Sequence, residues 1–461
     1  MQVLLDDVNR ELCKKSFYDF FLEFWDVIES EKLVDNWHIK ALCEELQEVA
    51  ERVIRREAKE YDLVINIPPG TSKSTICTVM FPAWLWIRDP SLRIISSSYS
   101  ASLSINHAIK SRDLILSDKY QRLFAIELKD DQAGKSHYKN KNNGERMATS
   151  TGGTVTGFHA HVIILDDPLN PKEAESEAER ATANEYIQNT LTTRKVDKAI
   201  TVTILVMQRL HDDDPSARLL KKDNVKHICL PAELSKDVQP LEWREKYKEG
   251  LLDPVRMNAG VLKELRDNLG SYGYAGQFMQ IPAPEDGGIW QREWFIPVPD
   301  KDFPTDLEFY GTDWDLAYTK NDKNSASAYV VAGKVGHNIY IDRIDWRWLE
   351  FPELIKWMKN QPDPHYIERK ASGKSAKQTL SADGINAIEV DALSDKIARA
   401  RTASPTAEAG RVFVRESQLD KLLNDTRQGL LKFPNGEHDD LADAFAQSLK
   451  RLSTTFNPFV I

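Results

Sequence analysis

Apolar residues in the first half of the chain follow a helical period and then a strand-like one. Residues 40–59 (KALCEELQEVAERVIRREAK) place Leu42, Leu46, Val49 and Val53 on one face at helical spacing, which predicts an amphipathic helix. Four short apolar runs typical of strands follow, separated by polar or helix-like stretches, at residues 63–67, 93–98, 162–166 and 201–206. Strands that alternate with helices predict a mainly parallel sheet covered on both faces.

The pattern changes twice in the second half of the chain. A stretch rich in proline, glycine and charge predicts a connector with helices of its own over residues 231–300. Three successive strand-like runs then predict a meander, at residues 307–316, 326–332 and 338–346. Two further strands and a final helix follow, at residues 365–370, 386–391 and 440–452. We therefore predict a first domain, a connector and a second domain, at residues 1–230, 231–300 and 301–461.

The composition is that of a folded globular protein with an acidic excess. At 461 residues the chain is long enough for two or three cores, and 41% hydrophobic and 29% charged residues are near the globular average. The formal net charge of −10 argues against a simple nucleic-acid-coating protein, although a global sum can hide a local basic groove. Charge alone therefore neither supports nor excludes DNA as a partner.

The cysteines and the apolar runs exclude several other classes of protein. Four cysteines without CxxC spacing indicate neither a zinc site nor a disulfide framework, and they fit a reducing cytosol: Cys13, Cys43, Cys77 and Cys229. The first residues, MQVLLDD, contain acids rather than a basic and then apolar leader, and no apolar run approaches the length of a membrane span. We expect a soluble protein with no signal peptide and no membrane partner.

The first candidate site follows the apolar run at residues 63–67. A phosphate-binding loop has the pattern G-x-x-x-x-G-K-[ST], and in the corresponding residues 67–74 only Lys73 and Ser74 match, with Gly70 displaced to the middle. By itself this favours the alternative, a proline-glycine turn before a helix. If the loop binds ATP, we expect the contacts to come from Pro69, Gly70, Thr71, Ser72, Lys73, Ser74 and Thr75.

Two later strand ends strengthen the phosphate-loop interpretation. Asp166 and Asp167 end the apolar run VIILDD, where one acid would hold Mg²⁺ together with Ser74 and the other would polarise the attacking water. The alternative is that these acids only cap the next helix. The run at residues 201–206 leads into Gln208, Arg209 and His211, where a γ-phosphate sensor would lie. Because ligands bind at the carboxyl ends of parallel strands, the combination favours an ATPase.

The second candidate site is a set of acidic residues in the last third of the chain. Asp313 and Asp315 lie on one face of a predicted strand, and buried acids are costly unless they are paired or hold a metal. Further acids end the strand HYIE and begin the last helix, at Glu368, Asp439, Asp440 and Asp443. This order of acids is typical of an RNase H-like nuclease, in which they hold two divalent ions about 3.5–4 Å apart. The alternative is that each acid is a helix cap or a solvated residue.

A basic cluster surrounds Glu368. The segment ERKASGKSAK supplies Arg369, Lys370, Lys374 and Lys377. Such a cluster suits a phosphate backbone, although it is equally compatible with a solvated loop.

Taken together, these motifs resemble the large subunit of tailed-bacteriophage terminases, from about residue 37 to 450. In that family the ATPase loop commonly has the pattern P-P-R-x-G-K-S/T, and PPGTSKST keeps both prolines and the last three residues but has Gly70 and Ser72 at the arginine and glycine positions. ILVMQRLHDDD resembles the motif that couples hydrolysis to movement, and YGYAGQFMQIPAPEDGGIWQREWF resembles the passage into the nuclease. Asp315, Glu368 and the acids of HDDLADA match the family's metal-binding positions.

The resemblance implies a fold, an activity and a set of partners. The expected fold is a P-loop ATPase with a mainly parallel sheet joined to an RNase H-like nuclease domain. The expected activity is ATP-driven translocation of viral double-stranded DNA into a procapsid and cutting of concatemeric DNA, with ATP and Mg²⁺ as cofactors and Mn²⁺ as an alternative at the nuclease. The expected partners are the portal protein, a small terminase subunit and further copies in a homo-oligomeric ring, which we expect to be a pentamer. Such a protein works in the host cytoplasm and transiently at the portal.

The resemblance also suggests roles for single residues. An arginine acting on a neighbouring subunit's ATP is implied, and the candidates are Arg112 and Arg194. Trp37 and His38 are candidates for adenine contact or for packing. The catalytic acids would be Asp167 in the ATPase, with Glu173 or Glu175 as alternatives, and Asp315, Glu368 and Asp440 in the nuclease.

Two rival functions remain open. One is a host-type helicase or repair ATPase with a nuclease, which would need motifs of a second motor lobe after residue 230, where none is evident. The other is a DNA-binding scaffold with a degenerate phosphate loop, for which replacing Lys73 would leave every activity unchanged.

Overall fold

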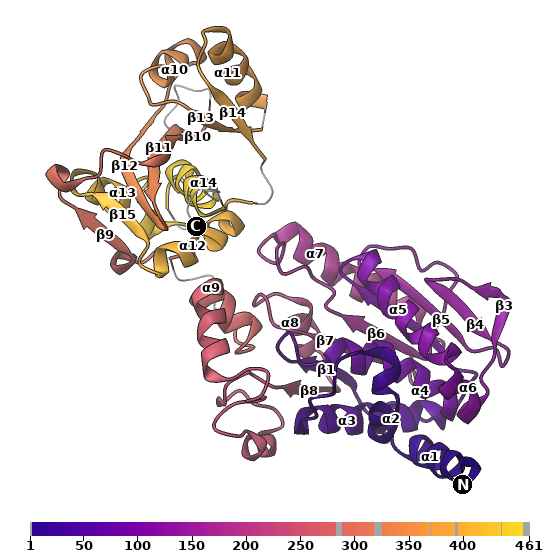
Figure 1. Ribbon diagram of the computed structural model, residues 1–461. Helices are drawn as coiled ribbons and strands as arrows, with labels where there is room; N and C mark the ends of the chain where they lie inside the picture. Colours follow the sequence, from indigo (N-terminus) through magenta and orange to yellow (C-terminus); the bar gives the residue numbers. More distant parts are fainter. Residues whose placement is uncertain are drawn as a thin grey trace. The chain divides into compact units, whose positions relative to one another are not determined.

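The computed structural model describes residues 2–282, 288–317, 325–369, 371–391, 395–434 and 436–454 (Figure 1). The chain folds as two compact units, Met1–Arg266 with Tyr272–Ala283, and Asp267–Ser271 with Pro284–Ile461. The stretch predicted as a connector is therefore divided between the two units.

The first unit is built on an eight-stranded sheet with the order β3-β4-β5-β2-β6-β7-β1-β8. Its strands are β1 Asp62–Asn66, β2 Arg93–Ser98, β3 Leu128–Ala133, β4 His137–Asn140, β5 Glu145–Ser150, β6 Val162–Asp166, β7 Val202–Met207 and β8 Val225–Cys229. All neighbours from β5 to β8 pair in parallel, whereas β3 and β4 form an antiparallel edge. The four apolar runs seen in the sequence form β1, β2, β6 and β7, so the mainly parallel sheet is confirmed.

Helical segments connect and flank these strands. They are α1 Gln2–Lys15, α2 Phe17–Ile28, α3 Trp37–Ile54, η1 Thr75–Met80, α4 Phe81–Arg88, α5 Ala101–Leu116, α6 Asp118–Phe124, α7 Glu177–Glu185, η2 Tyr186–Thr190, η3 Leu191–Arg194, α8 Pro215–Leu220, η4 Leu241–Lys246 and α9 Ala259–Gln277. The amphipathic helix predicted from residue 40 is α3, which starts earlier because the Asn36 side chain caps it, and which buries Leu42, Leu46 and Val49.

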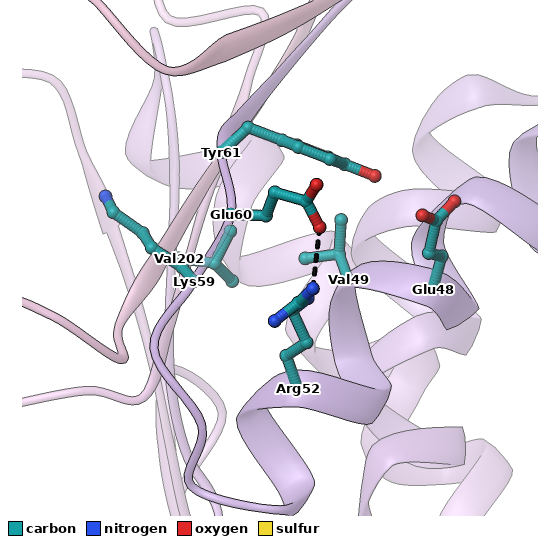
Figure 2. Close-up of a pocket in the computed structure, with 7 residues that line it drawn as sticks. All are labelled: Glu48, Val49, Arg52, Lys59, Glu60, Tyr61 and Val202. Atoms are coloured by element: carbon teal, nitrogen blue, oxygen red, sulfur yellow. Dashed lines mark hydrogen bonds and ion pairs between the residues drawn. The ribbon is translucent and has the colours of Figure 1, made fainter.

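β6 and β7 are buried along their whole length, as expected for central strands covered on both faces. Because β6 and β7 run parallel, the polar residues at their carboxyl ends, Asp166, Asp167 and Gln208, lie at the same edge of the sheet. The opposite edge holds a small pocket beside the residues that lead into β1, where Arg52 and Glu60 form an ion pair of 2.7 Å (Figure 2). That pocket lies at the amino ends of β1 and β7, away from the strand ends that carry the candidate chemistry.

The second unit is built on a seven-stranded sheet with the order β14-β13-β10-β11-β12-β15-β9. Its strands are β9 Phe295–Val298, β10 Glu308–Asp315, β11 Ser327–Val335, β12 Asn338–Arg347, β13 His365–Glu368, β14 Ala387–Val390 and β15 Val412–Arg415. β10, β11 and β12 form the predicted antiparallel meander, whereas β13 runs parallel to β10. The helical segments are η5 Arg292–Trp294, η6 Asp300–Asp302, α10 Phe351–Met358, α11 Ala371–Ala382, α12 Lys396–Glu408, α13 Glu416–Asn424, η7 Leu430–Lys432 and α14 Asp440–Thr454.

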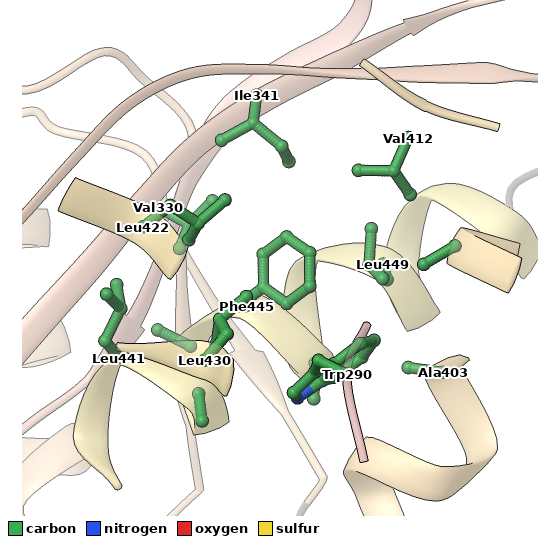
Figure 3. Close-up of a cluster of buried hydrophobic side chains, with 14 of the residues drawn as sticks. Trp290, Val330, Ile341, Ala403, Val412, Leu422, Leu430, Leu441, Phe445 and Leu449 are labelled. Atoms are coloured by element: carbon green, nitrogen blue, oxygen red, sulfur yellow. The ribbon is translucent and has the colours of Figure 1, made fainter. Parts of the chain in front are cut away.

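The last helix, α14, divides its faces between the core and the acids. Phe445 and Leu449 are fully buried in a cluster with Trp290, Ile341 and other apolar side chains (Figure 3). The polar positions at Asp440, Asp443, Gln447 and Arg451 recur every three or four residues and therefore form a separate stripe. Packing of the apolar face thus fixes where the acidic first turn points.

No helix in the described ranges combines the length and the apolar character needed to cross a bilayer.

Candidate functional sites

The loop between β1 and η1 has the backbone conformation of a tight turn. Gly70 has a φ of 79° and Ser72 a φ of 62°, both in the left-handed region. For a residue with a Cβ this conformation costs roughly 1–2 kcal/mol, so Ser72 is a serine in a glycine-type position. Its strain is offset by a brace, because Arg256 Nη1 donates to Ser72 Oγ over 3.1 Å while Arg256 Nε contacts Asp253 at 2.6 Å.

A second brace reaches the same loop from α3. His38 Nε2 lies 3.2 Å from the carbonyl oxygen of Thr71, and the Thr71 hydroxyl donates to the carbonyl of Pro68 over 2.8 Å. Burial, followed by the nearby charge of Arg256, lowers the pKa of His38 to about 4, so the imidazole is neutral near pH 7. The loop is therefore held in shape by Arg256 and His38 as well as by the positive φ of Gly70.

The loop and the acids after β6 meet, as the sequence predicts. Lys73 Nζ lies 2.9 Å from Asp167 Oδ1, and both Lys73 and Asp166 are buried. The Ser74 hydroxyl donates to Asp166 Oδ1 over 3.0 Å, and the Thr78 hydroxyl donates to Asp166 Oδ2 over 2.8 Å. Residues separated by about ninety positions along the chain thus form one polar cluster.

The electrostatics of this cluster favour an additional cation. Burial, followed by the charge of Asp167, raises the pKa of Asp166 to about 7, while Lys73 and the two hydroxyl donors act in the opposite direction. His107 Nδ1 lies 3.3 Å from Asp166 Oδ2, but burial and the charges of Arg146 and Lys110 lower the pKa of this histidine to about 4. Two carboxylates with one lysine leave negative charge to be balanced, and a serine hydroxyl beside a carboxylate is an oxygen donor set that suits Mg²⁺.

The strand end after β7 contributes one polar group to the acids. The Gln208 backbone N–H donates to Asp167 Oδ1 over 3.3 Å, and its buried Oε1 has no hydrogen-bond partner in the described ranges. Arg209 Nε instead pairs with Asp214 at 2.9 Å, and His211 Nδ1 accepts from the backbone N–H of Asp213. Gln208 is therefore the side chain of this segment placed for a ligand, and the next residues build the turn into α8.

The candidate arginines and aromatic residues make their contacts within the first unit. Arg112 lies on α5 and pairs with Asp113 at 3.3 Å. Arg194 ends η3, where it donates to the hydroxyl of Thr193. The Trp37 ring packs against Trp243 and Tyr247, with ring centroids 5.9 and 5.7 Å away. Of the two interpretations of Trp37, these contacts favour packing.

The alternative water-activating acids lie in the segment before α7. Glu173 is exposed, and its backbone N–H donates to the carbonyl of Asn170, while Glu175 lies two residues further on. Asp167, in contrast, lies within the polar cluster with a φ of 44°, a conformation uncommon for a residue other than glycine.

The acids of the second unit converge at the carboxyl ends of two neighbouring parallel strands. Asp315 ends β10, Glu368 ends β13 and Asp443 lies in the first turn of α14, and a carboxylate oxygen of each lies within 4.8 Å of the others. All three are largely buried. Asp440, one turn earlier on α14, accepts from the backbone N–H of Ala326 and from Gln428 Nε2.

Two cations from α12 enter the acid cluster, and the sequence interpretation missed both. Arg399 donates from Nη1 to Glu368 Oε1 over 2.6 Å and from Nη2 to Asp443 Oδ2 over 2.7 Å. Lys396 Nζ lies 3.2 Å from Asp315 Oδ2 and 2.7 Å from Asp439 Oδ1. The available signal was the spacing of three residues in KIARAR, which places both cations on one face of a helix capped by Asp395.

This cluster remains electrostatically strained despite its cations. Burial, followed by the charge of Asp315, raises the pKa of Asp443 to about 7, although Arg399 and Lys396 act in the opposite direction. Oδ1 of Asp440 and Oδ1 of Asp443 are buried without a hydrogen-bond partner among the residues that the structure describes. Oxygen-only donors with unused lone pairs fit a hard divalent ion such as Mg²⁺.

The two other acids of this region, Asp313 and Asp439, each pair with a cation. Asp313 and Asp315 do lie on one face of β10, but Asp313 pairs with Arg451 at 2.8 Å and accepts from Gln447 Nε2. Asp439 is 44% exposed and pairs with Lys396. We predicted that buried acids on this face are either paired or hold a metal. Asp313 is paired with Arg451, whereas Asp315 lies in the acid cluster that could hold a metal.

The basic cluster after Glu368 is partly neutralised. Arg369 pairs with Asp391 at 2.7 Å, and Lys377 lies 3.6 Å from Glu389. Lys374 is exposed on α11, and Lys370 lies outside the described residues.

The second unit has a mixed sheet, and carboxylates converge at the ends of two of its parallel strands. This arrangement is that of an RNase H-like domain. Residues 313–452 match the family model described as the terminase RNaseH-like domain. Residues 313–452 therefore carry a terminase RNase H-like domain, and the resemblance inferred from the sequence is confirmed for these residues.

Solved structures similar to the chain include three phage proteins. The large terminase from the thermophilic bacteriophage D6E in complex with ADP is 11% identical, with a TM-score of 0.46 over 81% of this chain and 88% of that chain. The HK97 bacteriophage large terminase is 12% identical, with a TM-score of 0.35 over 85% of this chain and 87% of that chain. The large terminase nuclease from the thermophilic phage G20c with bound magnesium is 16% identical, with a TM-score of 0.26 over 36% and 99%. No curated protein sequence matches the chain.

Proposed function

We propose that this chain is a terminase large subunit, which hydrolyses ATP to move viral double-stranded DNA into a procapsid and cuts concatemeric DNA with a metal-dependent nuclease. The observation that carries the proposal is the convergence of Asp315, Glu368 and Asp443 in a domain that matches the terminase RNase H-like family. The polar cluster around Lys73 in the first unit supports the ATPase part.

In the proposed nuclease, Asp315, Glu368 and Asp443 hold divalent ions, and Asp440 completes the site from the same helix turn. Mg²⁺ or Mn²⁺, when bound, activates water and stabilises the leaving oxygen of the phosphodiester. Asp439 is the exposed acid at the rim, where it positions Lys396. Burial of the other acids keeps bulk water away from the carboxylates and strengthens their interaction with a cation.

In the proposed ATPase, residues 69–75 bind the phosphates, Ser74 and Asp166 hold Mg²⁺, and Asp167 polarises the attacking water. Because Lys73 Nζ is within 2.9 Å of Asp167, a bound phosphate would draw the lysine away and free this carboxylate to act on water. Gln208 would contact the γ-phosphate, and Arg112 or Arg194 would act on the ATP of a neighbouring subunit.

The proposal extends to domains and partners. Residues 1–230 would form the ATPase domain and residues 301–461 the nuclease, with a connector between them. The partners would be double-stranded DNA, the portal protein, a small terminase subunit and other copies in a ring, which we propose to be a pentamer. The protein would act in the host cytoplasm and at the procapsid portal.

Two variants test the two activities separately. We expect Asp315→Asn to reduce Mg²⁺- or Mn²⁺-dependent cutting of plasmid DNA to background and to leave ATP hydrolysis intact, because it removes one of the carboxylates that would hold the metal. We expect Lys73→Ala to abolish ATP hydrolysis and to leave cutting intact. Matched controls are Asp345→Asn, which lies in a surface pair with Lys421, and Lys110→Ala, which lies in a surface pair with Glu29.

Equal cutting by Asp315→Asn and wild type would exclude the nuclease site. Unchanged ATP hydrolysis in Lys73→Ala would exclude the phosphate loop. If neither wild type nor Lys73→Ala hydrolysed or bound nucleotide, the loop would be only a turn, as in a DNA-binding scaffold.

A further inference from the structure

The cations on α12 occupy positions that a metal ion would need. Arg399 bridges a carboxylate from β13 and one from α14, at 2.6 and 2.7 Å. Lys396 lies within 4.0 Å of four carboxylates, those of Asp315, Asp439, Asp440 and Asp443. Both cations therefore compete for the oxygens that the proposed nuclease uses as ligands, so any role for them in metal binding rests on that proposed site.

Charge balance explains why such cations are present. Asp315, Glu368, Asp440 and Asp443 are all at most 8% exposed. Carboxylate oxygens of Asp315, Glu368 and Asp443 lie within 4.8 Å of one another, and three buried carboxylates this close cannot all remain ionised without positive charge. Arg399, itself 8% exposed, and Lys396 supply two charges. A guanidinium across two carboxylates is a strong arrangement, because both hydrogen bonds are charge-assisted.

The arrangement nevertheless leaves polar atoms unsatisfied on both sides. Arg399 Nε and Oδ1 of Asp443 are buried without a hydrogen-bond partner within the described part of the chain. Unpaired buried polar groups are costly, so these atoms are available to a further partner. The cluster thus binds its two cations while at least one carboxylate oxygen remains without a hydrogen bond, as expected for a site that can also bind a metal ion.

We propose that Lys396 and Arg399 are tethered counter-ions that hold the acid cluster together before metal binds and that divalent ions displace. Metal loading then requires the first turns of α12 to release Glu368 and Asp443. The two released cations lie beside the loaded site, where their charge attracts a phosphodiester backbone. Lys396 and Arg399 are positioning residues in this scheme, because they act through the metal ligands.

The test measures Mn²⁺ binding by titration calorimetry and the thermal midpoint with and without Mn²⁺, on the full chain. The variants are Arg399→Met and Lys396→Met, and the matched control is Arg411→Met, an exposed arginine in the same domain. We expect Arg399→Met to have a lower thermal midpoint than wild type without metal and to bind Mn²⁺ at least about tenfold more tightly. Mn²⁺ should raise the thermal midpoint of this variant more than it raises that of wild type. Lys396→Met should show the same signs to a smaller degree.

Tighter binding separates displacement from a structural role, because a residue that only supports the fold would weaken metal binding when removed. Wild-type Mn²⁺ affinity in both variants, or weaker affinity, would overturn the counter-ion proposal while leaving the nuclease site in place. Failure of wild type itself to bind Mn²⁺ would remove the proposed site and the inference together. If Arg399→Met does not fold, Lys396→Met decides the question by the same criteria.

Discussion

The two acidic sites of this protein balance their buried carboxylates in different ways. In the first unit the acids are consecutive, Asp166 and Asp167, and their lysine and serine partners, Lys73 and Ser74, come from one short segment. In the second unit the acids come from two strands and a helix, and their cations come from a further helix, α12.

The difference concerns hydrogen bonds as much as charge. Both oxygens of Asp166 accept from hydroxyl groups, those of Ser74 and Thr78, so this carboxylate is satisfied by neutral donors. Asp443 has one oxygen bonded to a cation and one without a hydrogen-bond partner among the described residues. Asp166 is thus held by neutral hydroxyl donors, whereas Asp443 is held by a cation that, under our proposal, a metal ion would displace.

We expect the largest effect from a change in the Lys73–Asp167 ion pair of the first site. Asp167→Asn should reduce ATP hydrolysis by about 10²–10⁴-fold, the range for loss of a general base, while nucleotide binding persists because Lys73 is released. Steady-state hydrolysis and binding of a fluorescent ATP analogue measure the two quantities. The control is Asp223→Asn, an exposed acid of the same unit. Unchanged hydrolysis would transfer the role to Glu173 or Glu175.

Two acids on the same face of β10 sharpen the comparison within the second unit. Asp313→Asn should lower the free energy of unfolding by about 3–5 kcal/mol, because it breaks the ion pair between the fully buried Asp313 and Arg451. Asp315→Asn should lower it far less, because this change removes negative charge from a cluster that has an excess. Denaturant unfolding of both variants measures the difference, and equal losses would mean that Asp315 is also a structural acid.

A neutral histidine offers a way to weaken the first site by acid. An unfolded histidine is protonated near pH 6.5, whereas folded His38 is protonated only near about pH 4, so the unfolded state binds more protons between these values and stability falls as pH falls. At pH 5 the shifted pKa of His38 should lower the free energy of unfolding by roughly 2 kcal/mol relative to neutral pH.

His38→Gln should therefore lose less thermal stability than wild type between pH 7.5 and pH 5, about the interval in which histidine titrates. Other buried histidines of this unit shift in the same direction, so only the difference between the two proteins is informative. The same pH dependence in both would show that His38 does not titrate as its burial indicates.

The smallest effect concerns the basic cluster. Lys374→Ala should weaken DNA binding equally for all sequences and lower the slope of log affinity against log salt by about 1, whereas Arg369→Ala should change it less because Arg369 is paired with Asp391. Fluorescence anisotropy at several salt concentrations measures both slopes. Identical slopes for wild type and Lys374→Ala would place the DNA elsewhere.

Much of the fold followed from local patterns. Continuous apolar runs marked β1, β2, β6 and β7, and the meander β10 to β12 appeared as three successive strand-like runs. Such periodicity is visible in the sequence because the face of a helix or strand on which a side chain lies is set by its position in that element. The expectation that acids at strand ends gather at one edge followed from the parallel order of the strands.

The sequence by itself determined which elements form and which of their ends carry acids, lysine and hydroxyl groups. Tertiary structure decided that Asp313 is neutralised by Arg451, and that Asp315 joins Glu368 and Asp443. It also decided that Arg399 enters the acid cluster from a separate helix. The physical reason is that charge compensation acts through space between groups far apart in the chain, and no local period records which partner a buried carboxylate will meet.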